Sequence, residues 1–380
     1  MAVQAEPIRS PASSGGRALT AEEQYYAAGQ WTLMWRRFLK HRLGIVSFIM
    51  LGFAYFFALT YDFWAPYGEH AEHGFLNSPP TKIHFWDSEG NFQGPFVYGM
   101  VEEMDMVTFK RNYSDDLTKI HKLGLFQQGD SYEFWGLFET DRHFFGVGKE
   151  GVLHLFGSDS LGRDLFSRVL AASRISLSVG LIGVALSFVL GIVIGGISGY
   201  FGGTTDLVIQ RFIEFLISIP TIPLWMGLSA AIPVQWSSIQ VFFIITIILS
   251  IVGWAGLARV VRGKLLELRE YDYVTAARVA GAGNMRIIFD HLVPGFLSYL
   301  IVSLTLSVPG MILGETTLSF LGLGIRPPAV SWGTLMQDAQ NVRSLAVHPW
   351  MLFPGMFVII AVLLFNFMGD GLRDAADPYK

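Results

Sequence analysis

Three charged side chains beside long apolar runs could do chemistry. Arg211 and Glu214 are three residues apart, so a helix would place them on one face, and Glu315 ends a further apolar run. A charge at membrane depth is costly and by default suggests a pathway or a gate. The alternative for Arg211 and Glu214 is that they only neutralise each other near the membrane interface. The sequence does not decide between the two.

Other chemistries find little support. A phosphate-binding loop needs a glycine-rich segment that ends in Gly-Lys-Ser or Gly-Lys-Thr. The two Gly-Lys pairs, at 148–149 and 263–264, are followed by Glu and Leu, so we expect no ATP hydrolysis by that route. His70 and His73 could bind a metal ion in a loop, but two histidines without a third defined ligand favour no site. The chain has no cysteine, so thiolate chemistry is excluded, and we expect no catalytic, cofactor or metal residue.

The composition indicates a membrane protein. Only 15% of the 380 residues are charged and 52% are apolar, whereas a typical soluble domain has about 25% charged residues. The apolar residues gather in blocks of about 20, long enough to cross a hydrocarbon layer of about 30 Å as helices. The net charge of −4 provides no basic surface, so nucleic acid is not an expected partner.

Six membrane spans are predicted from these blocks. Their approximate bounds are 43–61, 175–205, 207–232, 237–258, 296–314 and 349–369. The polar residues 1–30 have no apolar period and are expected to be a disordered tail rather than a cleaved signal peptide. Short flanks rich in Lys and Arg face the cytoplasm, so both termini and the 259–295 loop are expected there.

Two segments leave alternatives open. Gly191, Gly195, Gly199 and Gly203 form overlapping small-xxx-small motifs in the second span, which fit either packing within the chain or a subunit interface. The long segment 62–174, expected outside the cytoplasm, mixes aromatic residues with charges and glycines. Its short alternating pieces predict strands and loops that could form a cap.

The 272–294 loop is the most informative stretch. Thr275, Ala276 and Ala277 predict a helix with small side chains, Gly281 breaks it, and a second amphipathic helix containing Ile288 leads to a proline. Small residues on an exposed helix let a partner surface approach the backbone closely. The loop is therefore predicted to be a docking element.

The spacing Ala276-Ala277-x3-Gly281-x9-His291-x-Val293-Pro294 resembles the EAA loop of permease subunits of binding-protein-dependent ABC importers. Thr275 stands where that motif carries an acidic residue. Further stretches are similar to the C-type permease chain of the oligopeptide/dipeptide (peptide/nickel) family, and they lie at 156–168, 206–220, 315–324 and 369–378. The insert of about 90 residues, 68–155, is longer than the corresponding loop of typical relatives, and the resemblance says nothing of its role.

The resemblance implies an all-α membrane protein with six transmembrane helices, the type I ABC importer permease fold and a long extracytoplasmic insert between spans one and two. It implies a bacterial inner-membrane, multi-pass protein without cofactor. The implied domains are 1–42 (cytoplasmic tail and pre-span helix), 43–61 (span one), 62–174 (insert and family loop) and 175–380 (permease core with the 259–295 coupling loop).

The resemblance implies that the chain forms one half of the translocation pathway of an ATP-driven importer and has no catalytic group of its own. The implied partners are a second homologous permease, two ATPase subunits, an extracytoplasmic solute-binding protein, a peptide substrate and membrane lipid. The residues implied for ATPase coupling are Tyr273, Thr275, Ala276, Ala277, Gly281, Ile288, His291 and Pro294. The alternatives are a self-contained secondary transporter or channel, and then a membrane enzyme. Which peptide or other solute is carried does not follow from the sequence.

Overall fold

The computed structural model describes residues 30–107, 111–148 and 151–377, and the predicted N-terminal tail lies almost wholly outside them. Five helical stretches are long and apolar enough to cross a membrane, and a bent pair raises the number to six if it counts as one span. The six-span prediction is therefore met by length and composition. The main helices of the bundle are α3 (Arg42–Leu59), α5 (Leu165–Phe201), α6 (Gly203–Ser218), α7 (Thr221–Ala230), α8 (Ser238–Leu268), α11 (Leu297–Phe320) and α14 (Phe353–Ala376).

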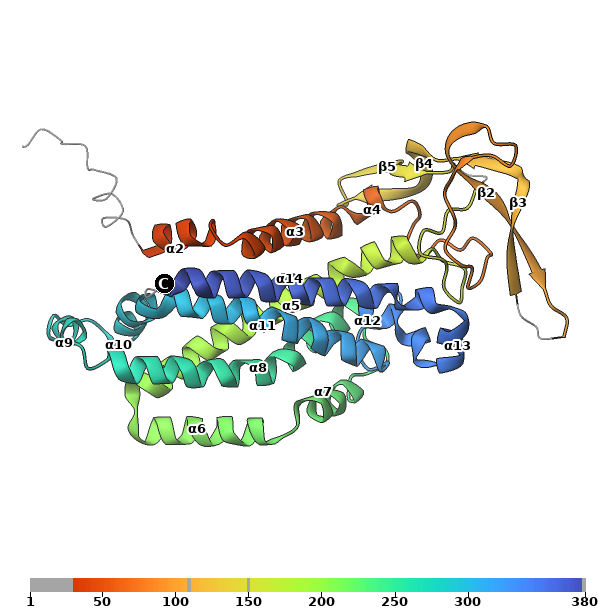
Figure 1. The fold of residues 1–380 in the computed structure, drawn as a ribbon. Helices are drawn as coiled ribbons and strands as arrows, with labels where there is room; N and C mark the ends of the chain where they lie inside the picture. The colour runs from red at the N-terminus through yellow and green to blue at the C-terminus, as the bar shows by residue number, and fades with distance from the viewer. Residues whose placement is uncertain (1–29, 108–110, 149–150, 378–380) are drawn as a thin grey trace, which may run out of the picture.

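The centre of the bundle is formed by α5, which packs against α8 and α11 (Figure 1). The close approach of α5 and α8 depends on glycine. A Cβ on Gly195 would lie 2.5 Å from the carbonyl oxygen of Ala258, and one on Gly199 would lie 2.7 Å from that of Arg262. Gly191, Gly195 and Gly199 thus pack within the chain, as the first of the two alternatives predicted, whereas Gly203 begins α6 and has nothing within 4 Å of an added Cβ.

Several helix bounds differ from those expected. The second span begins at Leu165 rather than near 175, because Asp164 caps the helix by accepting a hydrogen bond from Ser167 N at 2.8 Å. The predicted third span is broken into α6 and α7, which meet at 85° around Pro220. Proline has no N–H to continue the helical ladder, and hydropathy alone does not register that break.

The insert carries the strands that its alternating pieces predicted. The strands β1 (His84–Trp86), β2 (Phe92–Met104) and β3 (Arg111–Lys122) form one antiparallel sheet in the order β1-β2-β3, and β4 (Gly124–Phe134) and β5 (Phe138–Gly146) form a separate hairpin. A small core of Val97, Val147 and Leu153 closes the base of the insert. The all-α description therefore holds for the helical bundle but not for the insert.

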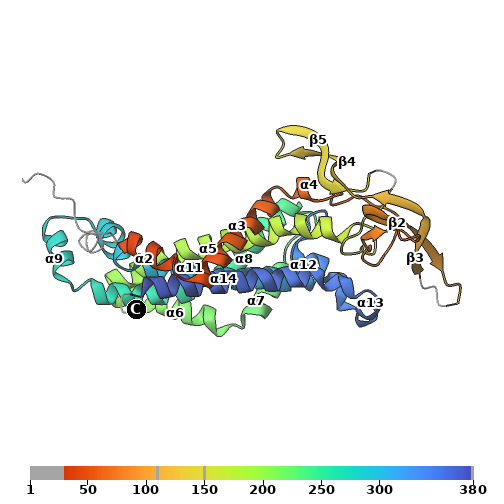
Figure 2. The same cartoon turned by 45° about the horizontal axis from the view of Figure 1, so that its top comes forward.

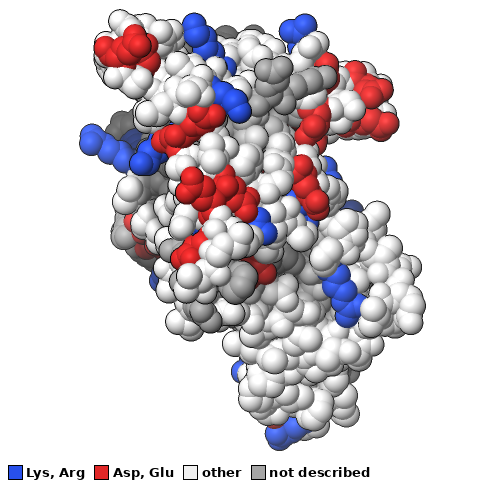
Figure 3. Space-filling view, turned by 90° about the vertical axis from the view of Figure 1, so that its right-hand side faces the viewer, with Lys and Arg blue, Asp and Glu red and all other residues white. Residues whose placement is uncertain are grey.

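The molecule has two distinct ends (Figures 1 and 2). The strands lie at one end, together with α12 (Trp332–Leu335) and α13 (Val342–Val347). At the other end lie α2 (Gln30–Phe38), the C-terminal end of α14 and α9 (Asp272–Val279). The helix α2 packs on α14 through Met34, Phe38 and Ala375. Seen from the strand end, acidic side chains gather on the upper part of the surface, while the lower part carries little charge (Figure 3).

Candidate functional site: the loop between α8 and α11

The helix α9 stands at the tip of the 272–294 loop (Figure 1). Gly281 terminates it with a φ of +84°, a conformation that suits glycine, and Gly281 N and Ala282 N donate to the carbonyl oxygens of Arg278 and Ala277. These bonds satisfy carbonyl groups that the end of a helix would otherwise leave open. The predicted small-residue helix and its glycine break are both present.

One side of the loop is packed into the bundle. Val274 of α9 is fully buried, as are Ile287, Ile288 and Leu292 of the π-helix at 287–292 that follows α10 (Asn284–Arg286). They form one cluster with Val261 and Leu265 of α8, Ile192 of α5 and Leu300 of α11. Ile288, predicted to couple to an ATPase, is therefore a core residue that contacts the spans. The packed side of the loop therefore contacts the ends of three long helices, α5, α8 and α11.

The other side of the loop is open. Tyr273, Thr275, Ala276, Gly281, His291 and Pro294 are exposed, and Ala277 is half-buried. Sequence reasoning missed a set of exposed apolar side chains beside them: Val279 is 83% exposed, Met285 52% and Phe289 44%. Exposed apolar residues next to small ones make a surface suited to a protein partner. Their signal in the sequence was an apolar Val279 on the polar side of a short helix.

Polar contacts fix the loop to the end of α5. The Tyr200 hydroxyl donates to Asn284 Oδ1 at 2.9 Å, and the Arg278 guanidinium lies over the Tyr200 ring, 5.9 Å from its centroid. Asp206 at the start of α6 accepts from Arg262 Nε at 2.5 Å, from Arg262 Nη2 at 2.6 Å and from Ser198 Oγ at 2.6 Å. This network joins α5, α6 and α8 directly beside the loop.

The predicted pathway residues are not brought together. Arg211 donates to Glu214 at 2.7 Å, and their side chains are 73% and 53% exposed on α6. They have the geometry of a neutralising pair, and they lie among exposed apolar residues that include Phe212 and Phe215. Glu315 is fully buried within the bundle and accepts from Ser176 Oγ at 3.2 Å and Ser319 Oγ at 2.6 Å. It braces α5 against α11.

A cavity of 280 Å³ lies between α5, α7, α8 and α11, and no pattern in the sequence indicates it. Its polar lining comes from Ser187, Thr221, Ser303 and Ser307, while Trp225 and several aliphatic side chains supply the rest. Hydroxyl groups on apolar helices also occur where helices simply pack together, so their presence in the sequence does not indicate a cavity. Only the folded chain shows that these four line one space.

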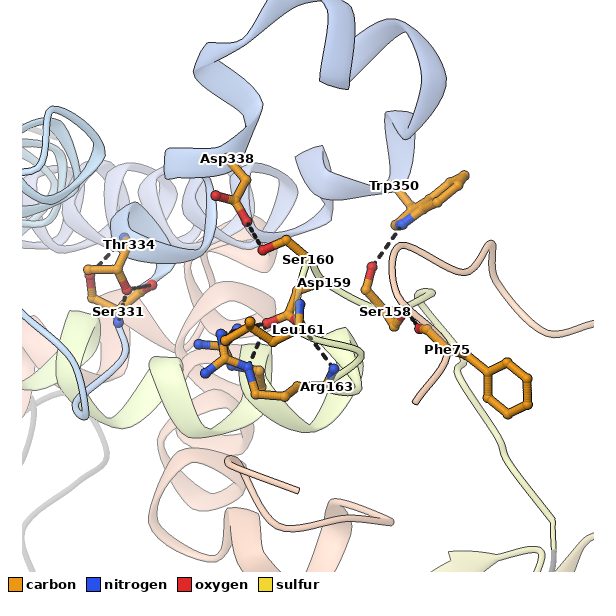
Figure 4. Close-up of polar contacts among 11 residues, drawn as sticks. Phe75, Ser158, Asp159, Ser160, Leu161, Arg163, Ser331, Thr334, Asp338 and Trp350 are labelled. Atoms are coloured by element: carbon orange, nitrogen blue, oxygen red, sulfur yellow. Dashed lines mark hydrogen bonds and ion pairs between the residues drawn. The ribbon is translucent and has the colours of Figure 1, made fainter. Parts of the chain in front are cut away.

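The segment 156–168 forms a clamp at the strand end (Figure 4). Asp159 accepts from Leu161 N at 2.9 Å and from Arg163 Nε at 2.8 Å, and it pairs with the buried Arg168. Ser160 Oγ donates to Asp338 at 3.0 Å, and Trp350 Nε1 donates to Ser158 O at 3.2 Å. The clamp thus ties the start of α5 to the segment between α11 and α14.

Asp164 of this clamp and His154 just before it have shifted pKa values. Burial raises the pKa of Asp164 to about 7, although Ser167 donates two hydrogen bonds to its carboxylate. Burial lowers the pKa of His154 to about 3, and the nearby His73 acts in the same direction. His154 Nδ1 lies 2.7 Å from Ser78 Oγ in the buried base of the insert.

The two histidines considered as metal ligands, His70 and His73, have different neighbours. His70 Nε2 lies 3.4 Å from Glu69 Oε1, whereas the His73 ring packs against Tyr67 with 4.0 Å between ring centroids and 57° between the ring planes. Within the described part of the chain, no three His, Asp or Glu side chains come together in a way that could hold a metal ion.

Comparison with known proteins agrees with this architecture. The family described as "Binding-protein-dependent transport system inner membrane component" matches residues 191–379, and the "N-terminal TM domain of oligopeptide transport permease C" matches residues 29–80. The oligopeptide transport permease OppC of Haemophilus influenzae is 43% identical over 59% of this chain and 70% of its own length. OppC of Bacillus subtilis is 40% identical over 59% and 72%, and DppC, the dipeptide transport permease of that organism, is 41% identical over 59% and 68%.

A solved structure of the MetNI methionine ABC transporter, in an inward-facing conformation, is similar at a TM-score of 0.43 and 19% identity, over 55% of this chain and 95% of that chain. In the binding-protein-dependent importers of the matched family, ATP is hydrolysed by separate subunits, so the permease component is not itself catalytic. The identity to the curated permeases and the match to both families show that the chain belongs to the oligopeptide and dipeptide permeases of the C type, membrane-spanning components of binding-protein-dependent ABC importers.

Proposed function

We propose that this chain forms one half of the pathway of an importer for oligopeptides or dipeptides and couples it to ATPase subunits through the 272–294 loop. The peptide substrate is inferred from the relatives, which are named for oligopeptide and dipeptide transport. The family membership disfavours a self-contained secondary transporter or channel.

The observation that carries the coupling proposal is the two-sided loop. Its open side presents small and apolar residues such as Ala276 and Val279, and its packed side reaches three long helices through Val274 and Ile288. A partner that moves the open side therefore biases the arrangement of α5, α8 and α11. Coupling requires that ATP binding and hydrolysis favour two different arrangements of these helices.

A second permease chain is proposed to cover the face of α6. Besides the Arg211–Glu214 pair, this face exposes Leu207, Phe212 and Phe215 to more than half of their surface, and few residues of α6 are buried. An exposed ion pair within an apolar helix is costly in lipid, and a partner helix offers it polar groups. With this partner, the hydroxyl-lined cavity beside α7 would face the shared pathway.

The proposed orientation places α9 and both termini in the cytoplasm, and the strands with α12 and α13 outside. The described ends of the chain lie at the α9 end, as an even number of crossings requires (Figure 1). A binding protein would then dock on the strand end, and the ATPases on the α9 end.

The test is reconstitution of the purified complex. The tagged chain should recover a homologous permease and ATP-binding cassette subunits, and proteoliposomes should take up a peptide only with ATP and binding protein present. Mass spectrometry of the ligand that the binding protein retains should identify the solute class. Uptake by this chain alone, without ATP, would overturn the proposal.

A further inference from the structure

The hairpin of β4 and β5 folds back toward the membrane bundle. In both views its turn lies beside the end of α3, whereas β2 and β3 extend away from the bundle (Figures 1 and 2). The turn is Phe134-Trp135-Gly136-Leu137-Phe138, five residues without a charge.

The two faces of the hairpin differ. Glu133 of β4 lies opposite Glu139 of β5 in the strand register, and both are exposed. The alternate positions Tyr132, Phe134 and Phe138 line a groove of 510 Å³ together with residues of α3 and α4 (Tyr61–Trp64). Since side chains alternate along a strand, the aromatic face turns to the membrane helix and the acidic face turns away from it.

Trp135 fixes the depth of the turn. Its indole Nε1 donates to the carbonyl oxygen of Leu59 at 2.7 Å, and Leu59 is the last residue of the first span. Trp135 does so with a positive φ of 54°, a conformation that strains a bulky side chain. The bond supplies a partner to a carbonyl that the helix end leaves open, and it holds the turn at the level where the span ends.

The turn leaves a large apolar surface open. Trp135 is 59% exposed, Leu137 76% and Phe138 58%, and this surface adjoins Phe56 and Leu59, the exposed residues at the end of α3. The exposed side of a span faces lipid or a partner helix. Aromatic side chains are enriched where membrane proteins cross from lipid to water, since their rings are apolar and their edges polar.

The groove also has a positively charged side chain, that of Arg142. Arg142 is exposed and lines the groove that Phe134 and Phe138 line. No carboxylate in the described part of the chain forms an ion pair with its guanidinium. A guanidinium beside an aromatic groove matches the chemistry of a phospholipid, whose phosphate accepts paired hydrogen bonds and whose chain is apolar.

We propose that the β4–β5 hairpin is an interfacial anchor: its turn lies in the outer leaflet, and its groove seats a phospholipid with the phosphate at Arg142. The inference rests on the proposed placement of the insert outside the cytoplasm. The occupant is lipid because the groove continues the exposed surface of the first span and ends at its last turn.

The absence of cysteine makes a depth measurement direct. Spin labels on Leu137→Cys and on Leu117→Cys, an exposed leucine of β3, are compared in the complete complex in phospholipid nanodiscs. The label at 137 should be relaxed more by oxygen than by a water-soluble nickel chelate, and the label at 117 should show the reverse. Strong relaxation of both labels by the chelate, or shielding of position 137 from both reagents by a protein, would overturn the proposal.

Lipid retention provides a second readout. Native mass spectrometry of the complex should show a retained phospholipid whose occupancy falls several-fold in Arg142→Gln and not in Lys122→Gln, an exposed cation of β3. Equal loss or equal retention in both variants would mean that the groove holds no specific lipid. Labelling of Leu117→Cys from outside intact cells tests the placement of the insert separately, so failure of the orientation and failure of the anchor are distinguishable.

Discussion

Small side chains have two different roles in this protein, and burial separates them. Gly195 and Gly199 are buried where α5 and α8 come into contact, and any larger residue there would meet backbone atoms. Ala276 on α9 and Gly281 just beyond its end are exposed, and a Cβ added to Gly281 would meet nothing within 4 Å. Small residues on a surface that no described residue of the chain covers suit contact with a partner.

Ala276→Asp tests that explanation. Because Ala276 is exposed, the substitution should change the stability of the isolated chain by no more than about 0.5 kcal/mol. In a contact with an ATPase it would bury an unpaired charge at a cost of roughly 2–5 kcal/mol. Co-purification of the ATPases and ATP-driven uptake should both fall sharply, whereas Ala276→Ser, which stays small and neutral, should retain both. Normal uptake by Ala276→Asp would show that α9 is not the docking element.

Gly281→Asn and Gly281→Val test the backbone conformation at Gly281 separately from its place on the docking surface. At a φ of +84° asparagine is tolerated, while a β-branched residue loses roughly 1–2 kcal/mol. We expect Gly281→Val to lower the thermal unfolding temperature and Gly281→Asn to leave it nearly unchanged. Equal stability of the two variants would contradict the assigned turn.

Asp164 of the clamp and His154 beside it should make stability respond to pH in two opposing ways. His154 has a folded pKa of about 3, below its unfolded value, so its contribution to stability is lost as pH falls below about 6.5. Asp164 has a folded pKa of about 7, above its unfolded value, so its protonation adds stability as pH falls from about 7 to about 4. Each effect reaches at most about 1.4 kcal/mol per pH unit, and in the native chain they offset each other.

Asp164→Asn and His154→Gln should expose these opposing slopes. Asn at 164 keeps the helix cap and removes the titration, so acidification from about pH 7 to about pH 5 should destabilise this variant more than the native chain. His154→Gln should instead be relatively stabilised by the same change. Thermal unfolding of the reconstituted complex at both pH values measures the difference, and slopes equal to those of the native chain in both variants would contradict the assigned burial.

At the scale of elements, local patterns predicted the helices and failed at their joints. The hydropathy of 207–232 predicted one span, and only Pro220 hinted at the 85° break between α6 and α7. The resemblance of its loop to a coupling motif predicts that Ile288 belongs to the docking element, and the structure shows its side chain buried against three helices. Amphipathic periodicity shows that a helix has a buried side but does not show what covers it.

The insert illustrates the same limit. Alternation predicted strands, but it did not predict which strands pair or where the hairpins point. The contacts of the base are long-range: Ser78 N donates to Ser158 Oγ at 2.8 Å, and Thr81 N donates to His154 O at 2.8 Å. Removing residues 72–150 would therefore also open the clamp that begins α5, so a test of the insert has to leave its base intact.

A shorter β2–β3 hairpin satisfies that condition. Met100 and Asp115 face each other in the sheet, so residues 101–114 can be replaced by Asn-Gly, which favours a tight hairpin turn. The base of the insert, with Phe96 and Val97 buried, stays in place. If the distal hairpin contacts the binding protein, the concentration of loaded binding protein needed to stimulate the ATPase should rise about tenfold, equivalent to about 1.4 kcal/mol.

Tyr113→Phe serves as the control for this change, because the Tyr113 hydroxyl donates to Leu76 O at 2.5 Å and the shortened hairpin loses that bond. Tyr113→Phe should leave the titration near that of the native chain. An unchanged titration in the shortened variant would exclude a docking role for the distal hairpin.

At the scale of the whole molecule, the two ends carry opposite kinds of surface. The α9 end presents small and apolar residues, and the strand end presents the acidic insert, in which residues 62–155 contain 15 acidic and seven basic side chains (Figure 3). A long external segment crosses the membrane largely regardless of charge, whereas the Lys and Arg residues near the span ends set the orientation. The separation of the two surfaces by a bundle of membrane length agrees with ATPases on one side and a binding protein on the other.

Labelling of single cysteines in the cysteine-free chain measures that orientation without background. The structure selects the positions: Ser88 in the insert, Val342 at the start of α13 and Val279 at the end of α9 are exposed, whereas Ser331 is fully buried and would stay silent on either side. In intact spheroplasts an impermeant maleimide should label Ser88→Cys and Val342→Cys but not Val279→Cys. After lysis Val279→Cys should react in the chain produced alone and be shielded in the complete complex, since the α9 surface would then be covered. Labelling of position 279 from outside would invert the molecule in the membrane and place the small-residue surface out of reach of any cytoplasmic ATPase.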